Sequence, residues 1–473
     1  MSYRANASGQ HWRRRIWVIV AVVVVLGAIV WQVFHSRREF PPSAFTAFVS
    51  RTICSGTFVS GLTPNQVYAD TIRPMRGVEQ INWALRYGVD LTSHEVRASL
   101  GGLFESIAVF REELGCILVH GDAPPRPSNT LPTVVQLAPK PVPEQIAGPS
   151  VTEPADPRLR AALDRAFAES DQAPLRRTAA VVVVRDGRIV AERYAPGYRV
   201  DTPLLGWSVT KSVVNALVGI LVHKGVLSVD NPAPVPGWRE ASDPRHTLTI
   251  NNLLRMTSGL NIDETNREYD AVARMILAES DMAGFAERAE LKEPPGAKWY
   301  YTSGNTLILS RIIRDAVGGN ARDVIAFARR ELFEPLGMRN ITLEFDAADT
   351  PIGSTYMYAS ARDWARFGAL FVNDGVMNGR RILPEGWVRY SSSQTLDSPY
   401  AAGFWLGSKR WRTQWRMPSD AFFASGLLGQ RVMIIPSERL VIVRFGNSHG
   451  PGYDIQGFGQ LVSEVVEVFK QSR

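Results

Sequence analysis

The sequence predicts an α+β protein in which an antiparallel sheet is built from both ends of a long C-terminal domain. Two stretches of strand-like residues are separated by Asp186-Gly187, a pair typical of a tight hairpin turn. Three more apolar stretches follow near the C-terminus, and the intervening residues 212–390 have mostly helical spacing. The predicted strands are residues 178–184, 188–194, 421–424, 430–435 and 440–445. Strands at both ends with helices between them indicate one sheet with a helical insertion.

A helix is expected at each end of this domain. Leu159, Leu163 and Phe167 recur at helical spacing within residues 159–170, and residues 458–469 form a closing helix. We therefore predict one domain over residues 158–473, with terminal helices flanking the sheet.

The N-terminus predicts a membrane anchor. Residues 16–34 are apolar and uncharged, long enough for a spanning helix, and follow Arg13, Arg14 and Arg15. The arginine bias favours a cytoplasmic tail and an extracytoplasmic catalytic domain at the plasma (inner) membrane, hence periplasmic. A cleaved signal peptide is the alternative, but no small-x-small cleavage site follows. Residues 1–39 carry +5 of the net charge of +7, so a nucleic-acid-binding face is not indicated.

Residues 40–120 are expected to form a small folded segment. Residues 81–86, 103–110 and 113–119 look like strands. The only cysteines, Cys54 and Cys116, would form a disulfide in an exported compartment; two separate buried thiols are the alternative. Residues 121–157 contain ten prolines, which predicts an extended connector.

The strongest chemical signal is Ser208 with Lys211, at the start of a long apolar helix. Residues three apart lie on one helix face, so the amine can reach the hydroxyl. A lysine desolvated beside a buried helix has a lowered pKa and can activate a serine nucleophile. The pair alone is weak evidence, because an N-cap serine followed one turn later by a lysine is common.

Two further motifs support the pair. Tyr301 lies in Tyr300-Tyr301-Thr302-Ser303-Gly304-Asn305, and a tyrosine held near a lysine can exist partly as phenolate or relay protons. Ser425-Gly426-Leu427 opens a hydrophobic strand, where a glycine allows close backbone approach and a following N–H can serve an oxyanion hole.

Together these motifs resemble the class C-like branch of the β-lactamase and penicillin-binding superfamily, and most closely its esterases and 6-aminohexanoate-dimer hydrolases. Three other stretches share the resemblance. They are Thr249-Ile250-Asn251-Asn252-Leu253-Leu254-Arg255-Met256-Thr257-Ser258-Gly259-Leu260, Phe333-Glu334-Pro335-Leu336-Gly337-Met338 and Ala359-Ser360-Ala361-Arg362-Asp363-Trp364-Ala365-Arg366-Phe367. The resemblance implies a β-lactamase/transpeptidase-like fold.

The resemblance also implies roles. Ser208 would be the nucleophile, Lys211 its activating partner and Tyr301 the general acid and base. The backbone N–H groups of Ser208 and Leu427 would form the oxyanion hole. The expected substrate contacts are Ser303, Asn305, Ser425 and Gly426.

One departure affects the substrate. The superfamily's Lys-Thr-Gly is here Ala424-Ser425-Gly426, which lacks the cation that holds a β-lactam or peptide carboxylate. Strand alternation is expected to point Arg431 away from Ser425, so Arg431 does not replace that cation.

The expected function is therefore hydrolysis of a small ester or amide through an acyl-enzyme. The alternatives are a catalytically silent binding or scaffold protein and a β-lactamase or D-amino-peptidase. Asp263 and Glu264 are interpreted as exposed loop acids, while His449 is a weaker candidate for facing the cleft. The histidine spacing suggests no metal site, and no cofactor is expected.

Overall fold

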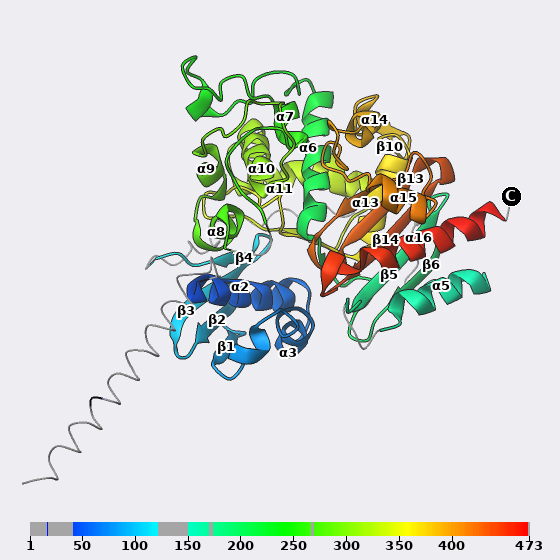
Figure 1. Cartoon of the computed structure of the whole chain (residues 1–473), viewed down its shortest axis with the longest axis horizontal. Coiled ribbons are helices and arrows are strands. Elements are labelled where there is room, and N and C mark those ends of the chain that lie inside the picture. The colour runs from blue at the N-terminus through cyan, green and yellow to red at the C-terminus, as the bar shows by residue number, and fades with distance from the viewer. Residues whose placement is uncertain (1–16, 18–40, 122–149, 170–173, 266–268, 472–473) are drawn as a thin grey trace, which may run out of the picture.

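The computed structural model describes residues 17, 41–121, 150–169, 174–265 and 269–471. A five-stranded antiparallel sheet lies at the centre of the C-terminal domain, in the order β12-β13-β14-β5-β6 (Figure 1). Its strands are β5 (Thr178–Arg185), β6 (Arg188–Tyr194), β12 (Phe422–Ser425), β13 (Arg431–Ile435) and β14 (Leu440–Gly446). Strand β14 pairs with β5, which joins the two ends of the domain as expected.

Alternating apolar residues give this sheet two buried faces. Val181 and Val183 pack with α5 (Pro157–Phe167) and α16 (Ile455–Lys470), which contact each other in Figure 1. Val182 and neighbouring side chains face α13 (Ala361–Val372) on the other side. The terminal helices and the central sheet thus form the layers of an α+β fold.

The insertion between β6 and β12 is mostly helical. Its helices are α6 (Thr210–His223), α7 (Ile250–Leu254), α8 (Ala271–Ala278), α9 (Met282–Glu287), α10 (Ser303–Val317), α11 (Ala321–Ala328), α12 (Glu334–Leu336), α13, α14 (Trp387–Ser392) and α15 (Lys409–Gln414). It also contains short strands: β7 (Leu204–Leu205), β8 (Ile341–Leu343), β9 (Met357–Ala359), β10 (Val376–Met377) and β11 (Arg380–Arg381). Strands β7, β9 and β8 form a small sheet that the sequence analysis did not anticipate.

Residues 41–121 fold into a helix packed on a four-stranded antiparallel sheet, coloured blue to cyan in Figure 1. We call this unit the N-terminal domain. Its helices are α2 (Pro42–Cys54), α3 (Pro64–Val67) and α4 (Val78–Ile81), with π-helical turns η1 (Ser55–Val59) and η2 (Tyr68–Ile72). Its strands are β1 (Leu85–Asp90), β2 (Glu95–Leu100), β3 (Leu103–Arg111) and β4 (Gly115–Leu118).

The strand predicted at residues 81–86 is wrong for most of its length. Residue Ile81 ends α4, a turn follows, and β1 begins only at Leu85. Within β1 the apolar residues Leu85, Tyr87 and Val89 alternate with exposed positions, so the alternation that marks the strand begins at residue 85 and not at residue 81.

Cys54 and Cys116 form a disulfide that joins the end of α2 to β4. The predicted membrane span at residues 16–34 lies, apart from residue 17, outside the described residues, and most of the proline-rich connector does too. Within the described ranges, no helix is both long and apolar enough to cross a bilayer.

Candidate active site

Ser208 lies in a 3₁₀ turn, η3 (Trp207–Val209), that continues directly into α6. Trp207 has a φ of 47°, in the left-handed region that a tryptophan rarely adopts. Such strain is typical of sites where the surrounding fold fixes an unfavourable backbone conformation. The turn contacts β12, so Ser208 lies between the helical insertion and the edge of the central sheet.

Lys211 is buried on α6 and its amine has three polar contacts. Nζ donates to Ser208 Oγ at 2.8 Å, to Ser303 Oγ at 3.0 Å and to the Ser354 carbonyl at 2.9 Å. Burial lowers the pKa of Lys211 to about 8, although the negative charge of Glu264 acts to raise it. The lysine can therefore lose its proton near neutral pH, as a general base must.

Tyr301 lies close to both Ser208 and Lys211. Its hydroxyl hydrogen-bonds Ser208, and its ring lies 5.0 Å from Lys211 Nζ. Burial raises the pKa of Tyr301 well above its usual value, and the charge of Glu264 adds to this effect. The environment therefore keeps the phenol protonated and disfavours the phenolate considered from the sequence.

Tyr301 belongs to an aromatic cluster. Its ring centroid lies 5.3 Å from that of Trp405 and 5.7 Å from that of Tyr400. Trp299 contacts both of these rings. These contacts hold the phenol ring in one orientation beside Ser208.

Glu264 is a site residue that the sequence analysis missed. Its Oε2 accepts a hydrogen bond from the Ser303 backbone N–H at the start of α10, and its carboxylate also bonds the Ser303 side chain. Burial raises the pKa of Glu264, while the positive charge of Lys211 lowers it. Asp263, the adjacent acid, is exposed and pairs with Lys292 at 2.9 Å, as a loop acid should.

Two of the four predicted substrate contacts have other partners. Asn305 is fully buried: its Oδ1 accepts from Ser258 Oγ at 2.8 Å and its amide nitrogen approaches Met256 Sδ. Ser303 is also buried, and its hydroxyl lies between Lys211 and Glu264. The polar groups of both residues are thus used inside the protein, and their contact with substrate stays a prediction.

The other two predicted contacts, Ser425 and Gly426, lie at the end of β12 beside η3, the turn that carries Ser208. An added Cβ on Gly426 would stand 2.3 Å from the Gly206 carbonyl oxygen, so only glycine fits this close approach. Leu427 follows in a short turn, η6 (Leu427–Gly429), in which Leu428 has a φ of 56°. Ser425, Gly426 and Leu427 thus border the turn that carries Ser208.

The expectation for Arg431 was wrong in its geometry. Arg431 is the direct cross-strand partner of Ser425, so the two side chains lie on the same face of the sheet. The buried guanidinium instead donates through Nη1 to the carbonyls of Gly426 and Gln430, both at 2.7 Å. Arg431 therefore supports the backbone of the turn from within.

His449 lies away from these groups. It forms an isolated bridge with Leu175, on the segment before β5. The residues that the structure brings together at Ser208 are thus Lys211, Tyr301, Ser303 and Glu264.

Similarity to known proteins covers most of the C-terminal domain. The β-lactamase family matches residues 163–462. A 6-aminohexanoate-dimer hydrolase of Paenarthrobacter ureafaciens is 24% identical over 294 residues, which cover 58% of this chain and 74% of that protein.

Solved structures show the same fold. A Bacillus anthracis protein provisionally assigned as a 6-aminohexanoate-dimer hydrolase has a TM-score of 0.55 and 22% identity, covering 70% of this chain and 89% of its own. A family VIII carboxylesterase has a TM-score of 0.51 and 16% identity, and the match covers 67% of this chain and 98% of the carboxylesterase. The match to the family spans more than half of the sequence. The chain therefore belongs to the β-lactamase family and is a serine hydrolase.

Proposed function

We propose that this enzyme cleaves an ester or amide bond through an acyl-enzyme on Ser208. The observation that carries the proposal is the contact of 2.8 Å between Lys211 Nζ and Ser208 Oγ, made by a buried lysine whose pKa is lowered to about 8. When the pH equals this pKa, about half of the molecules hold a neutral Lys211 amine, which can accept the serine proton.

The contacts of Lys211 orient its lone pair. The Ser354 carbonyl can only accept, so it takes one N–H of the neutral amine. The Ser303 hydroxyl donates to Glu264 and is free to accept a second N–H. The lone pair then faces Ser208 Oγ.

The reaction begins when Ser208 attacks the substrate carbonyl carbon and its proton passes to Lys211. The backbone N–H groups of Ser208 and Leu427 stabilise the resulting oxyanion. Tyr301, a neutral phenol, gives its proton to the leaving oxygen or nitrogen as the bond to that atom breaks, and it takes a proton back from the Lys211 ammonium, so both groups return to their starting state. Water then adds to the acyl-enzyme by the same route, releasing the acid and restoring Ser208.

Labelling with an alkyl fluorophosphonate tests the nucleophile. We expect one covalent adduct on Ser208 by peptide mass spectrometry, and neither label nor ester turnover in Ser208→Ala. Ser419→Ala, which changes an exposed serine, is the control and should label like the wild type. Labelling or turnover that survives Ser208→Ala would overturn the assignment.

The name of the Paenarthrobacter relative points to an amide substrate, and the carboxylesterase neighbour points to esters. Both p-nitrophenyl butyrate and linear 6-aminohexanoate dimer should therefore be assayed. The alternative is a silent binding protein. Correctly folded protein that turns over neither substrate nor any short ester would favour that alternative.

We also propose that residues 16–34 anchor the enzyme with its catalytic domain outside the cytoplasm. The disulfide supports this location, because disulfides persist mainly in oxidising compartments. After cell fractionation, the full chain should stay in the membrane fraction and be cleaved by protease added to spheroplasts. Recovery in the soluble cytoplasmic fraction would contradict the proposal.

A further inference from the structure

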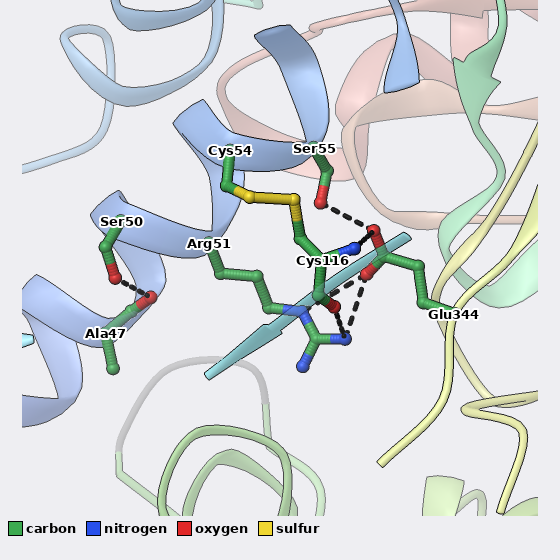
Figure 2. The surroundings of a disulfide bond; sticks show 7 residues. All are labelled: Ala47, Ser50, Arg51, Cys54, Ser55, Cys116 and Glu344. Atoms are coloured by element: carbon green, nitrogen blue, oxygen red, sulfur yellow. Dashed lines mark hydrogen bonds and ion pairs between the residues drawn. A yellow bond between two sulfur atoms is a disulfide. The ribbon is translucent and has the colours of Figure 1, made fainter. Parts of the chain in front are cut away.

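Glu344 is a fully buried carboxylate that follows β8 in the C-terminal domain, which we call the catalytic domain. Its side chain binds the N-terminal domain (Figure 2). Its Oε2 accepts from Arg51, with Nη2 at 2.9 Å and Nε at 3.3 Å. Its Oε1 accepts from Ser55 Oγ at 2.7 Å and from the Cys116 backbone N–H at 2.9 Å. Both carboxylate oxygens are therefore occupied by groups of the N-terminal domain.

The disulfide holds these donors in place. Cys54 lies on α2 between Arg51 and Ser55 in the sequence, and it is bonded to Cys116, whose N–H contacts the same carboxylate. Figure 2 shows the disulfide, the guanidinium and the carboxylate side by side. Because the bond links the elements that carry these donors, it limits their separation.

The backbone of Glu344 in turn fixes the loop that binds Lys211. Its N–H donates to the Tyr356 carbonyl at 2.9 Å, and its own carbonyl accepts from the Ile352 N–H at 2.8 Å. Ser354, midway between these two residues, provides the carbonyl that accepts from Lys211 Nζ. A displacement of Glu344 would therefore move an acceptor of the catalytic amine.

The N-terminal domain also contacts the nucleophile turn. Phe48 on α2 stacks on Trp207, the residue before Ser208, with ring centroids 6.4 Å apart. The Arg51 guanidinium lies 3.8 Å from the centre of the Tyr356 ring, and that ring contacts Trp207 as well. Two separate contacts thus lead from this domain to Ser208 and Lys211.

We propose that Glu344 is a positioning residue for Lys211, and that the disulfide-linked N-terminal domain is required for full activity because it fixes Glu344. This inference rests on the proposed function, in which Lys211 is the base. It assigns a catalytic purpose to a domain that lies outside the matched family region, residues 163–462.

The first test is Glu344→Gln in the full chain. Glutamine keeps the size of the side chain and an acceptor for Ser55 and Cys116, but it leaves Arg51 as a buried cation without its counter-charge. We expect kcat for p-nitrophenyl butyrate to fall at least about tenfold while KM changes less than about twofold, because an interaction specific to the chemical step is lost. Labelling of Ser208 by a small fluorophosphonate should slow in parallel.

The pH profile separates positioning from general destabilisation. The groups that face the Lys211 amine are Ser208, Ser303, Tyr301, Glu264 and the Ser354 carbonyl. Of these groups, only the Ser354 carbonyl is expected to be displaced in Glu344→Gln. Loss of a hydrogen bond to the ammonium lowers the pKa of lysine, so the acidic limb of kcat/KM should move to lower pH.

Glu192→Gln is the matched control. Glu192 is equally buried and pairs with Arg362 at 2.6 Å, but this pair lies between β6 and α13. Both variants are compared at a temperature where circular dichroism shows them folded. There, Glu192→Gln should keep the wild-type kcat, and the acidic limb of its kcat/KM profile should stay at the wild-type pH. Equal losses in the two variants would overturn the positioning role.

Two milder perturbations extend the test in case Glu344→Gln does not fold. The Ser55→Ala variant removes one of the hydrogen-bond donors to Glu344. Reduction of the wild type with dithiothreitol opens the disulfide. Each perturbation should change kcat more than it changes KM, with kcat falling. Wild-type kcat and pH profile in folded Ser55→Ala and in reduced enzyme would overturn the inference. If wild-type Ser208 is never labelled, the proposed function itself fails, which is a distinguishable result.

Discussion

At the residue scale, two opposing effects act on the pKa of Lys211, the proposed general base. Burial disfavours the ammonium, whereas the negative charge of Glu264 favours it. Glu264 also lies at the N-terminus of α10, where a helix dipole stabilises negative charge. The lysine pKa of about 8 reflects the balance of these effects.

Removing the charge of Glu264 should therefore change the pH dependence of the reaction. In Glu264→Gln the ammonium loses a favourable neighbour, so the pKa of Lys211 falls and the acidic limb of kcat/KM moves to lower pH by about 1 unit. Tyr301 and Tyr400 face the same carboxylate as neutral phenols, and Asp270 lies nearby as a second acid. The profile should be measured from pH 5 to 10 with p-nitrophenyl butyrate.

Asp263→Asn provides the control for this experiment. It removes the same charge one residue away, but from an exposed side chain paired with Lys292. Solvent screening makes such surface ion pairs weak, so the acidic limb of the kcat/KM profile of Asp263→Asn should stay at its wild-type pH. A limb that moves to higher pH in Glu264→Gln would contradict the electrostatic role of Glu264.

The substrate preference also depends on single residues. Ala424 is fully buried and Arg431 is bonded to backbone carbonyls, so neither offers a cation to a substrate carboxylate. A charge-assisted hydrogen bond contributes about 1.5–3 kcal/mol, which corresponds to at least about tenfold in rate. We expect kcat/KM for nitrocefin to be lower than that for p-nitrophenyl butyrate by this factor. A faster reaction with nitrocefin would favour a β-lactamase.

The end of strand β12 sets the geometry of the site at the element scale. Gly426 approaches the Gly206 carbonyl so closely that a methyl group would overlap backbone atoms, which cannot rotate away as a side chain could. Gly426→Ala should therefore displace β12 from the nucleophile turn and move the Leu427 N–H out of place. Losing one oxyanion donor typically lowers kcat by about 10²–10³.

The matched control for this variant is Gly237→Ala, where nothing lies within 4 Å of the added methyl group. It should keep wild-type kcat, and both proteins should be compared by steady-state kinetics and thermal melting. An active Gly426→Ala enzyme with an unchanged melting temperature would show that the close approach is not required.

Elements with strong local patterns could be predicted from the sequence. Strands β5 and β6 follow from apolar runs around Asp186-Gly187, and α16 follows from helical spacing. Strands β7 and β9 span only two and three residues, too few for a periodic pattern to appear. Their pairing depends on contacts between residues far apart in the chain, which a local reading cannot supply.

The same limit applies to the site. Ser208 and Lys211 are three residues apart and could be paired from helix geometry alone. Glu264 reaches Ser303 across 39 positions, and Arg51 reaches Glu344 across 293. An acid in a polar loop has the same composition whether it is exposed or buried, so only the fold distinguishes Glu264 from Asp263.

At the scale of the whole molecule, the N-terminal and catalytic domains share buried groups. The core of the N-terminal domain includes Leu277 from α8 of the catalytic domain, and Glu344 is buried against Arg51. Such a junction should not open without exposing an apolar core and a charged pair. We therefore expect urea to unfold the two domains together, with loss of ester turnover coinciding with loss of far-ultraviolet circular dichroism.

The disulfide should determine much of this shared stability. It joins residues 62 positions apart, and closing a loop of that length in the unfolded chain corresponds to about 4 kcal/mol of stabilisation. The Cys54→Ala/Cys116→Ala variant should thus unfold at a lower urea midpoint while keeping a single transition. Reduced and alkylated wild-type protein is the control and should match the variant. Helical signal lost at a urea concentration where turnover persists would show instead that the domains unfold independently.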